Sequence, residues 1–196
     1  MAKIVDKEQK KQDIALSCKD LILEKGLQNL TVSQMAEAAG VGKGTIYEYF
    51  RNKEEIVFEL ARILIEEHAT SLEEEIKTKS NTREKIKSFS SFFFDPKHMQ
   101  LREIYKQFVA LTLLNPQDEI VEFNTQSIQR YFVWFVSILE EGVEKKELKK
   151  QILDLSEGLF AVGDGLFFQS SVTNTLEDLH VKIDRYIDTI FDLMEI

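Results

Sequence analysis

Apolar residues recur along this chain at the three- and four-residue spacing of amphipathic helices. One such stripe ends at a glycine, the usual residue at a helix end, and consists of Ile14, Cys18, Leu21 and Ile22 before Gly26. A longer stripe consists of Ile56, Leu60, Leu64, His68 and Leu72. It predicts a helix from Lys53 to about Lys79, and no run of alternating polar and apolar residues predicts a strand. The pattern therefore indicates an all-α protein.

Capping residues mark where these helices begin. Thr31 with Gln34 has the spacing of a capping box, and Asn52 with Glu55 has the same spacing. Further candidate N-caps are Asn81, Asp95, Asn115, Asp154 and Asn174. The helices are therefore expected near 14–25, 32–39, 43–50, 53–79, 82–94, 97–114, 116–146, 155–171 and 175–195.

The most apolar stretch, residues 131–139, is open to two interpretations. Its sequence, YFVWFVSIL, is rich in aromatic and β-branched residues, which favours a buried strand. Turn residues are missing on both sides, however, and Phe123, Ser127, Tyr131, Phe135 and Leu139 keep an i+4 register. We therefore predict a fully buried helix.

Two short helices joined by a glycine turn predict a helix-turn-helix between Thr31 and Lys53. The residues expected to face inward are Val32, Met35, Ala36, Ala39, Val41, Ile46 and Phe50. The outer face of the second short helix then carries Lys43, Gly44, Thr45, Tyr47 and Glu48. The N-terminal end of a recognition helix meets base edges in the major groove, where lysine and threonine are suitable readers. A helical corner without a DNA role is the alternative.

Charge and aromatic residues divide the chain into two parts. Nine basic and nine acidic residues precede Ile56, so the whole net charge of −9 lies in the remaining sequence. Phe50 is the only one of the 14 phenylalanines in that first part. Because a negative surface repels nucleic acid, any DNA contact must be confined to a small N-terminal module. We place this module at residues 1–55 and a larger helical domain at 56–196.

The sequence TVSQMAEAAGVGKGTIYEYFRNKEEI, at 31–56, resembles the TetR family of bacterial transcription regulators almost position by position. With the preceding helix, the resemblance covers about residues 8–68. It implies an N-terminal three-helix DNA-binding domain followed by a helical bundle for ligand binding and dimerisation. The DNA-binding residues expected from the motif and the resemblance are Thr31, Ser33, Gly42, Lys43, Gly44, Thr45, Tyr47, Glu48, Tyr49 and Lys53.

Glu48 departs from a simple DNA-binding pattern because it places a carboxylate on the reading face. It has two possible roles. A carboxylate is able to accept a hydrogen bond from the amino group of cytosine. Alternatively, Glu48 forms an ion pair with Arg51 or Lys43 and lowers the affinity for DNA.

The aromatic residues of the second domain either fill a solid core or line a ligand pocket. The walls expected of a pocket are Phe89, Phe93, Phe108, Tyr131, Phe135 and Phe167. Apolar stripes on the last two helices are longer than one small core requires, and they predict a homodimer that pairs these helices as a four-helix bundle. The interface residues expected there are Leu155, Leu159, Val162, Leu166, Leu179, Ile183, Tyr186 and Ile190.

These features predict a DNA-binding transcription regulator: a dimeric repressor that leaves a palindromic operator when a small apolar or amphipathic ligand binds. In this scheme the helix beginning at Lys53 acts as a lever that changes the spacing of the two DNA-binding modules. An activator, a regulator without a ligand and an all-helical adaptor protein are the alternatives. Nucleophile–base pairs, phosphate loops and metal-ligand spacings are missing, so we expect no enzyme, cofactor or metal. The single cysteine suits a reducing cytoplasm, and we expect no membrane segment.

Overall fold

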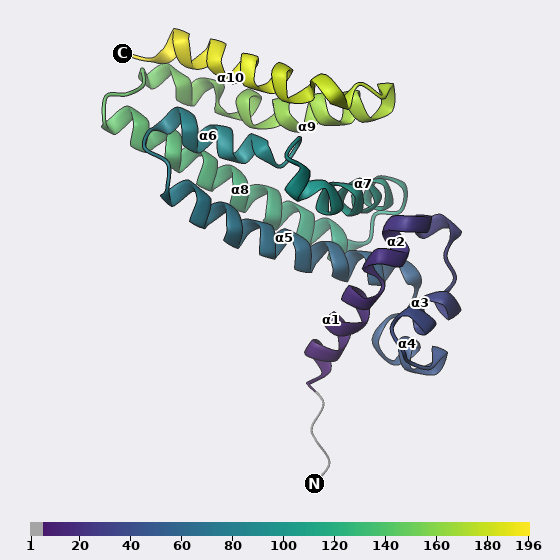
Figure 1. The fold of residues 1–196 in the computed structure, drawn as a ribbon. Helices are drawn as coiled ribbons and strands as arrows, with labels where there is room; N and C mark the ends of the chain where they lie inside the picture. The colour runs from purple at the N-terminus through teal and green to yellow at the C-terminus, as the bar shows by residue number, and fades with distance from the viewer. Residues whose placement is uncertain (1–5) are drawn as a thin grey trace. The chain divides into compact units, whose positions relative to one another are not determined.

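The computed structural model describes residues 6–196, and their secondary structure is helical, with no strand among them beyond one isolated bridge between Leu148 and Glu195 (Figure 1). The expected all-α fold class is confirmed. The first five α-helices are α1 (Lys7–Ser17), α2 (Lys19–Lys25), α3 (Val32–Ala38), α4 (Lys43–Tyr49) and α5 (Lys53–Lys77). The other five are α6 (Thr82–Ser91), α7 (Met99–Leu114), α8 (Asp118–Glu144), α9 (Ser156–Thr173) and α10 (Leu179–Met194). Short 3₁₀ helices lie at η1 (Leu27–Asn29), η2 (Pro96–His98), η3 (Lys150–Leu155) and η4 (Leu176–Asp178).

The apolar stretch 131–139 lies inside α8, so the helical interpretation of that stretch is confirmed. Its register buries Phe135 and Leu139, whereas Val133 and Ser137 point to solvent. The expectation that this stretch is buried on all sides was therefore wrong. One face of α8 provides core contacts, and the opposite face remains exposed.

The first predicted helix is divided at Cys18 into α1 and α2. The Cys18 N–H is shared between the carbonyl oxygens of Ile14 and Ala15, at 3.3 and 3.1 Å. In addition, the Ser17 hydroxyl donates to the carbonyl oxygen of Asp13 at 2.7 Å. Hydroxyl groups that bond back to the preceding turn bend helices, which accounts for the division.

Three expected N-caps, Asn115, Asp154 and Asn174, were wrong. Asn115 lies three positions before Asp118, the first residue of α8. Asp154 lies within η3, and α9 begins at Ser156 without a side-chain cap. Asn174 ends α9 in the left-handed conformation, with φ 55° and ψ 40°. Asparagine tolerates this conformation better than most residues, and it therefore suits a helix end as well as a helix start.

The described chain divides into two compact units. The first contains the residues up to Ala69 together with Gln100–Val121, and the second contains Thr70–Met99 with Glu122–Ile196. The expected module at residues 1–55 lies in the first unit, apart from residues 1–5, which are outside the described part. The function-based boundary after residue 55 stays a prediction.

Each unit has its own apolar core. In the first unit, the buried side chains include Ile22, Met35, Ile46, Phe50, Leu60, Ile104 and Phe108. In the second, they include Ile86, Phe135, Leu139, Phe167, Ile183 and Phe191. Within this second unit α10 lies beside α6 and α9 (Figure 1). Across residues 6–196, we find no helix that combines the length and apolar character needed to cross a membrane.

Candidate nucleic-acid interface

Hydrogen bonds at both ends of α3 fix the helix-turn-helix. At its start, Thr31 and Gln34 form the predicted capping box: the Gln34 N–H donates to Thr31 Oγ1 at 3.3 Å, and the Thr31 N–H donates to Gln34 Oε1 at 2.9 Å. At its end, Gly40 has φ +63°, a left-handed conformation that glycine adopts without strain. The Val41 N–H then reaches the Ala36 carbonyl at 3.0 Å, which closes the turn toward α4.

Helix α4 presents the face that the sequence predicts. Ile46 and Phe50 are buried, whereas Lys43, Gly44 and Glu48 are exposed. The Tyr47 side chain is 52% exposed, and the Lys43 ammonium lies 6.0 Å from the centre of its ring. Lys43 and Tyr47 therefore share one accessible face, as residues four apart on a helix do.

The remaining expected contact residues lie around this face with different degrees of exposure. Thr31, Ser33 and Gly42 are exposed, and Thr45 and Tyr49 are partly buried. A Cβ atom added at Gly42 or Gly44 would meet nothing within 4 Å. The chain leaves open space beside both glycines, so a DNA backbone has room to approach them.

Lys53 makes hydrogen bonds that the sequence did not indicate. Its ammonium donates to the carbonyl oxygens of Leu27, Leu30 and Gln28 at 2.9, 3.0 and 3.3 Å. The N–H of the same Leu27 donates to Gln107 Oε1 of α7 at 2.9 Å. The η1 turn before α3 is thus held from α5 and from α7. The expected phosphate contact of Lys53 stays a proposal beside this structural role.

A buried carboxylate joins α1 to α5. Glu59 is buried, and its oxygens lie 2.6 Å from Arg62 Nη2 and 3.8 Å from Lys11 Nζ. The hydrogen bond that Arg62 donates to the Glu59 carboxylate raises the pKa of Arg62 above its ordinary value. Lys11 also lies over the Phe50 ring, 5.7 Å from its centre. These contacts position the end of α4 against α1 and α5.

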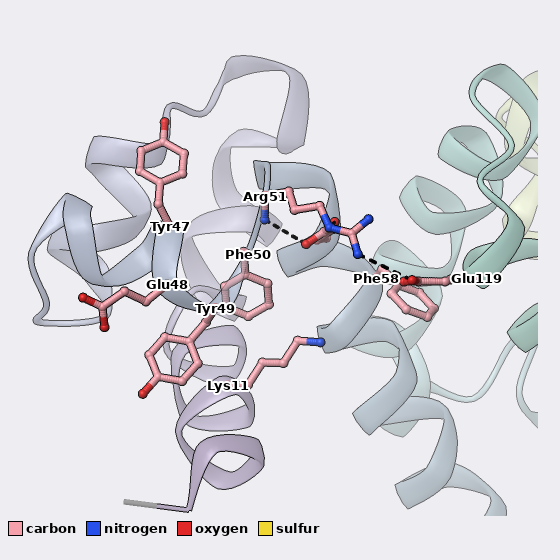
Figure 2. A pocket seen from close by; sticks show the side chains of 9 residues that line it. Lys11, Tyr47, Glu48, Tyr49, Phe50, Arg51, Phe58 and Glu119 are labelled. Atoms are coloured by element: carbon pink, nitrogen blue, oxygen red, sulfur yellow. Dashed lines mark hydrogen bonds and ion pairs between the residues drawn. The ribbon is translucent and has the colours of Figure 1, made fainter.

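Arg51 follows the recognition helix and pairs with two carboxylates. Its Nε lies 3.5 Å from Glu55 Oε1, and its Nη2 lies 3.6 Å from Glu119 Oε1 of α8. These side chains border a cavity of about 250 Å³ that is also lined by Lys11 and Phe58 (Figure 2). Sequence reasoning missed the contacts of Glu119 and Gln107 because their partners lie far away along the chain.

The two cations proposed as partners of Glu48 have other partners. Arg51 pairs with Glu55 and Glu119, and Lys43 lies over Tyr47. In Figure 2 the Glu48 side chain extends away from Arg51. The arrangement favours the base-reading interpretation of Glu48, which stays a proposal.

The residues expected to form a ligand pocket are divided between the two units. Phe108 is in the first unit, where its ring stacks on Phe58 with centroids 6.2 Å apart. In the second unit, Phe89 meets Phe135 edge-on at 5.4 Å, and Phe93 lies 5.8 Å from Phe167. Tyr131 lies 6.3 Å from Trp134, which in turn contacts Phe89. Five of the six expected pocket residues therefore lie in the second unit, and each of them contacts another aromatic ring there.

The predicted interface residues of α9 and α10 differ in exposure. Leu159, Leu179 and Ile183 are buried in the core of the single chain, so within this fold they have no free surface for a second copy. Leu155, the last residue of η3 just before α9, is exposed, and the partly buried members are Val162, Leu166, Tyr186 and Ile190. Gly163 of α9 faces the Phe93 ring of its own chain.

Comparison with known proteins assigns the segment that contains the helix-turn-helix to one family. The sequence model described as "Bacterial regulatory proteins, tetR family" matches residues 19–60. The fatty acid metabolism regulator protein of Bacillus subtilis is 31% identical over 135 residues, which cover 67% of this chain and 66% of that protein. The transcriptional repressor KstR2 of Mycolicibacterium smegmatis is 29% identical over 63% of this chain and 60% of its own length.

The chain belongs to the TetR family. Its fold agrees with solved members: a TetR-family regulator from Cytophaga hutchinsonii superposes with a TM-score of 0.76 at 18% identity, over 99% of this chain and 98% of that one. The fatty acid degradation regulator FadR of Bacillus halodurans gives a TM-score of 0.63 at 23% identity, over 89% and 96%. As a TetR-family member, the chain is a DNA-binding transcription regulator.

Proposed function

We propose that this TetR-family regulator is a dimeric repressor that binds a palindromic operator and leaves it when a small apolar or amphipathic ligand binds. The observation that carries the proposal is the accessible face of α4. Lys43 and Tyr47 lie side by side on it, while Ile46 and Phe50 anchor the opposite face in the core. This division leaves the polar face of α4 available to a DNA groove.

The contacts that we propose for this face fall into two classes. Lys43 reads a base edge, and Tyr47 and Tyr49 position the protein on phosphates. Lys43→Ala is therefore expected to lower affinity for the cognate site by about 1–3 kcal/mol and to relax base preference. Tyr47→Phe is the matched variant, because it removes one hydroxyl and keeps the ring.

The proposed roles are tested by titrating both variants against DNA upstream of the protein's own gene and against a scrambled duplex. Tyr47→Phe should weaken binding to both duplexes alike. Equal effects of Lys43→Ala on both would make Lys43 a phosphate contact. Binding of the unaltered protein should fall steeply with added salt, whereas an adaptor protein would form no complex at any salt concentration.

We propose that the dimer forms through the accessible part of the α9–α10 surface. Leu155, Val162, Leu166, Tyr186 and Ile190 retain exposed surface there. Val172 and Leu193, on the same two helices, are also exposed large apolar residues. Burial of such side chains supplies the usual driving force for association. Light scattering should give the mass of a dimer at micromolar concentration, and a monomeric mass would contradict the proposal.

We propose a ligand with an alkyl chain. The aromatic side chains around Phe89, Phe135 and Phe167 suit an apolar ligand. Two similar proteins are named for fatty acid metabolism and degradation. Palmitate is therefore the first probe, with acetate as the control for its carboxylate. Palmitate should release operator DNA and acetate should not; release by both or by neither would contradict this ligand class.

The proposed switch uses α5 as a lever. This helix is continuous from Lys53 to Lys77, about 37 Å at 1.5 Å per residue, and contributes residues to both units. A dimer must hold two recognition helices about 34–36 Å apart, or a multiple of that distance. The test cross-links the two N-terminal modules of a dimer at their DNA-bound spacing through engineered cysteines, in a variant from which Cys18 has been removed. This locked dimer should no longer release DNA when palmitate is added. Release from the locked dimer would overturn the lever.

A further inference from the structure

The Arg51 side chain lies between carboxylates from two different helices. Its backbone N–H donates to Glu55 Oε2 at 2.9 Å, and its guanidinium lies 3.5 Å from Glu55 Oε1. On the other side, Nη2 lies 3.6 Å from Glu119 Oε1 (Figure 2). The Arg51 guanidinium, just after α4, therefore contacts the start of α5 through Glu55 and the start of α8 through Glu119.

The two carboxylates hold Arg51 with different strength. The Glu55 side chain is 16% exposed and accepts from the Arg51 backbone as well as facing its guanidinium, so this contact is well defined. The side chains of Arg51 and Glu119 are 77% and 74% exposed. Water screens such a pair, which makes it weak and easily exchanged. Glu119 is thus the replaceable partner of Arg51.

A DNA phosphate is a suitable replacement for Glu119. Arg51 lies two residues beyond the last residue of α4, where the chain leaves the predicted reading face. A guanidinium binds phosphate through two parallel hydrogen bonds, a better match than a single contact at 3.6 Å. The adjacent cavity of about 250 Å³ gives the Arg51 side chain room to change rotamer.

The position of Glu119 depends on α8. It is the second residue of this helix, which runs without interruption from Asp118 to Glu144. The residues from Glu122 onward belong to the second unit. Because a helix moves as a stiff element, a shift or rotation of α8 changes the distance between Glu119 and Arg51.

We propose that Glu119 competes with a DNA phosphate for Arg51 and thereby sets operator affinity according to the position of α8. The proposal rests on the DNA-binding function proposed above. When the first turn of α8 lies near Arg51, the carboxylate occupies the guanidinium and also repels the phosphate backbone. When α8 moves away, Arg51 is released for DNA. Glu119 is therefore a regulatory residue outside the helix-turn-helix.

The test is a double-mutant cycle on DNA binding by the full-length protein. Glu119→Gln removes the charge and keeps the shape, and Glu122→Gln is the matched control one turn along α8, with the same change in net charge. The probes are a promoter fragment from the protein's own gene and a scrambled duplex, titrated at several salt concentrations. Arg51→Ala completes the cycle.

We expect Glu119→Gln to raise affinity for both duplexes by about two- to five-fold, the range of an exposed ion pair, and Glu122→Gln to raise it less. Arg51→Ala should lower affinity and reduce the salt slope by about 1, one phosphate contact. In the Arg51→Ala background, Glu119→Gln should have no more effect than Glu122→Gln.

Three results would overturn the competition. They are equal gains for Glu119→Gln and Glu122→Gln, a gain for Glu119→Gln that persists without Arg51, and a loss of affinity for Glu119→Gln. The last would mean that Glu119 positions Arg51 for DNA. Failure of the proposed DNA-binding function would be recognised separately, because the unaltered protein would then bind neither duplex. That result would also refute the competition between Glu119 and a phosphate. Because Glu119 is exposed, thermal unfolding should confirm that its variant folds normally.

Discussion

The ammonium group of Lys53 lies 2.9 Å from the carbonyl oxygen of Leu27, at the turn that leads into the helix-turn-helix. The same ammonium donates to Leu30 at 3.0 Å, and the Leu27 N–H is satisfied by Gln107. A lysine that the motif marks as a phosphate contact therefore also holds the turn before α3. The two roles predict different behaviour on mutation.

Lys53→Gln should lower the free energy of unfolding by about 1–3 kcal/mol, because the carbonyl groups of the turn lose a charged donor. The measurement is chemical denaturation of the variant and the unaltered protein. Lys43→Gln is the control: Lys43 is exposed, and its loss should change stability by no more than about 0.5 kcal/mol. If Lys53 only contacted phosphate, Lys53→Gln would leave the free energy of unfolding unchanged and would reduce only the salt dependence of DNA binding.

Local sequence signals predicted local structure well. The Thr31–Gln34 capping box and the caps at Asn52 and Asn81 all have their expected hydrogen bonds. These interactions span three residues, so the spacing of two side chains is enough to predict them. Asn174 shows the limit of such signals, since one residue type suits both helix starts and left-handed helix ends.

Contacts between distant segments were not predictable in the same way. Gln107 meets Leu27 across 80 positions, and Glu119 meets Arg51 only because α8 begins near the end of α4. Neither pair has a spacing rule, because tertiary packing alone brings the partners together. The same reason applies to Phe108, whose aromatic character predicted a pocket wall but whose ring stacks on Phe58 in the first unit.

Gly163 of α9 should not tolerate even a methyl group. A Cβ built there lies 2.2 Å from Cε2 of Phe93, so the Phe93 ring must move. We expect Gly163→Ala to destabilise the fold by about 1–3 kcal/mol, the usual effect of overpacking, despite the better helix propensity of alanine. Thermal or chemical unfolding measures this loss. In a Phe93→Leu background the loss should shrink; an unchanged loss would show that the ring is not the obstacle.

The Cys18 thiol should be inert in the folded protein. Cys18 is fully buried, and burial raises the pKa of its thiol to about 11. Because the thiolate is the reactive form, alkylation at pH 7 should be slow and should follow the unfolding of the first unit. A matched control is Ser17→Cys in a Cys18→Ala background, since residue 17 is exposed. Rapid labelling of native Cys18, as fast as labelling at position 17, would contradict the prediction.

The carboxylate of Glu147 should make the second unit sensitive to acid. It accepts from the Thr82 hydroxyl at 2.7 Å and from the Thr82 N–H at 3.0 Å, at the start of α6. These two donors hold the pKa of Glu147 below its usual value. The stabilisation is therefore fully present above the unfolded-state pKa of about 4.3 and is lost as the pH falls through the lower folded-state pKa.

Glu147→Gln should accordingly lower the free energy of unfolding at pH 7 by about 1–2 kcal/mol, because the buried Thr82 keeps a neutral acceptor in place of a charged one. The difference between the variant and the unaltered protein should shrink as the pH falls below the unfolded-state pKa of about 4.3 and through the lower folded-state pKa, because the carboxylate of the unaltered protein is then protonated. Denaturation curves across this fall in pH measure it. Glu144→Gln removes the same charge from an exposed site on α8 and should change stability by less than about 0.5 kcal/mol. A Glu147→Gln deficit that stays constant from pH 7 to pH 3 would mean that side-chain shape, and not charge, caps α6.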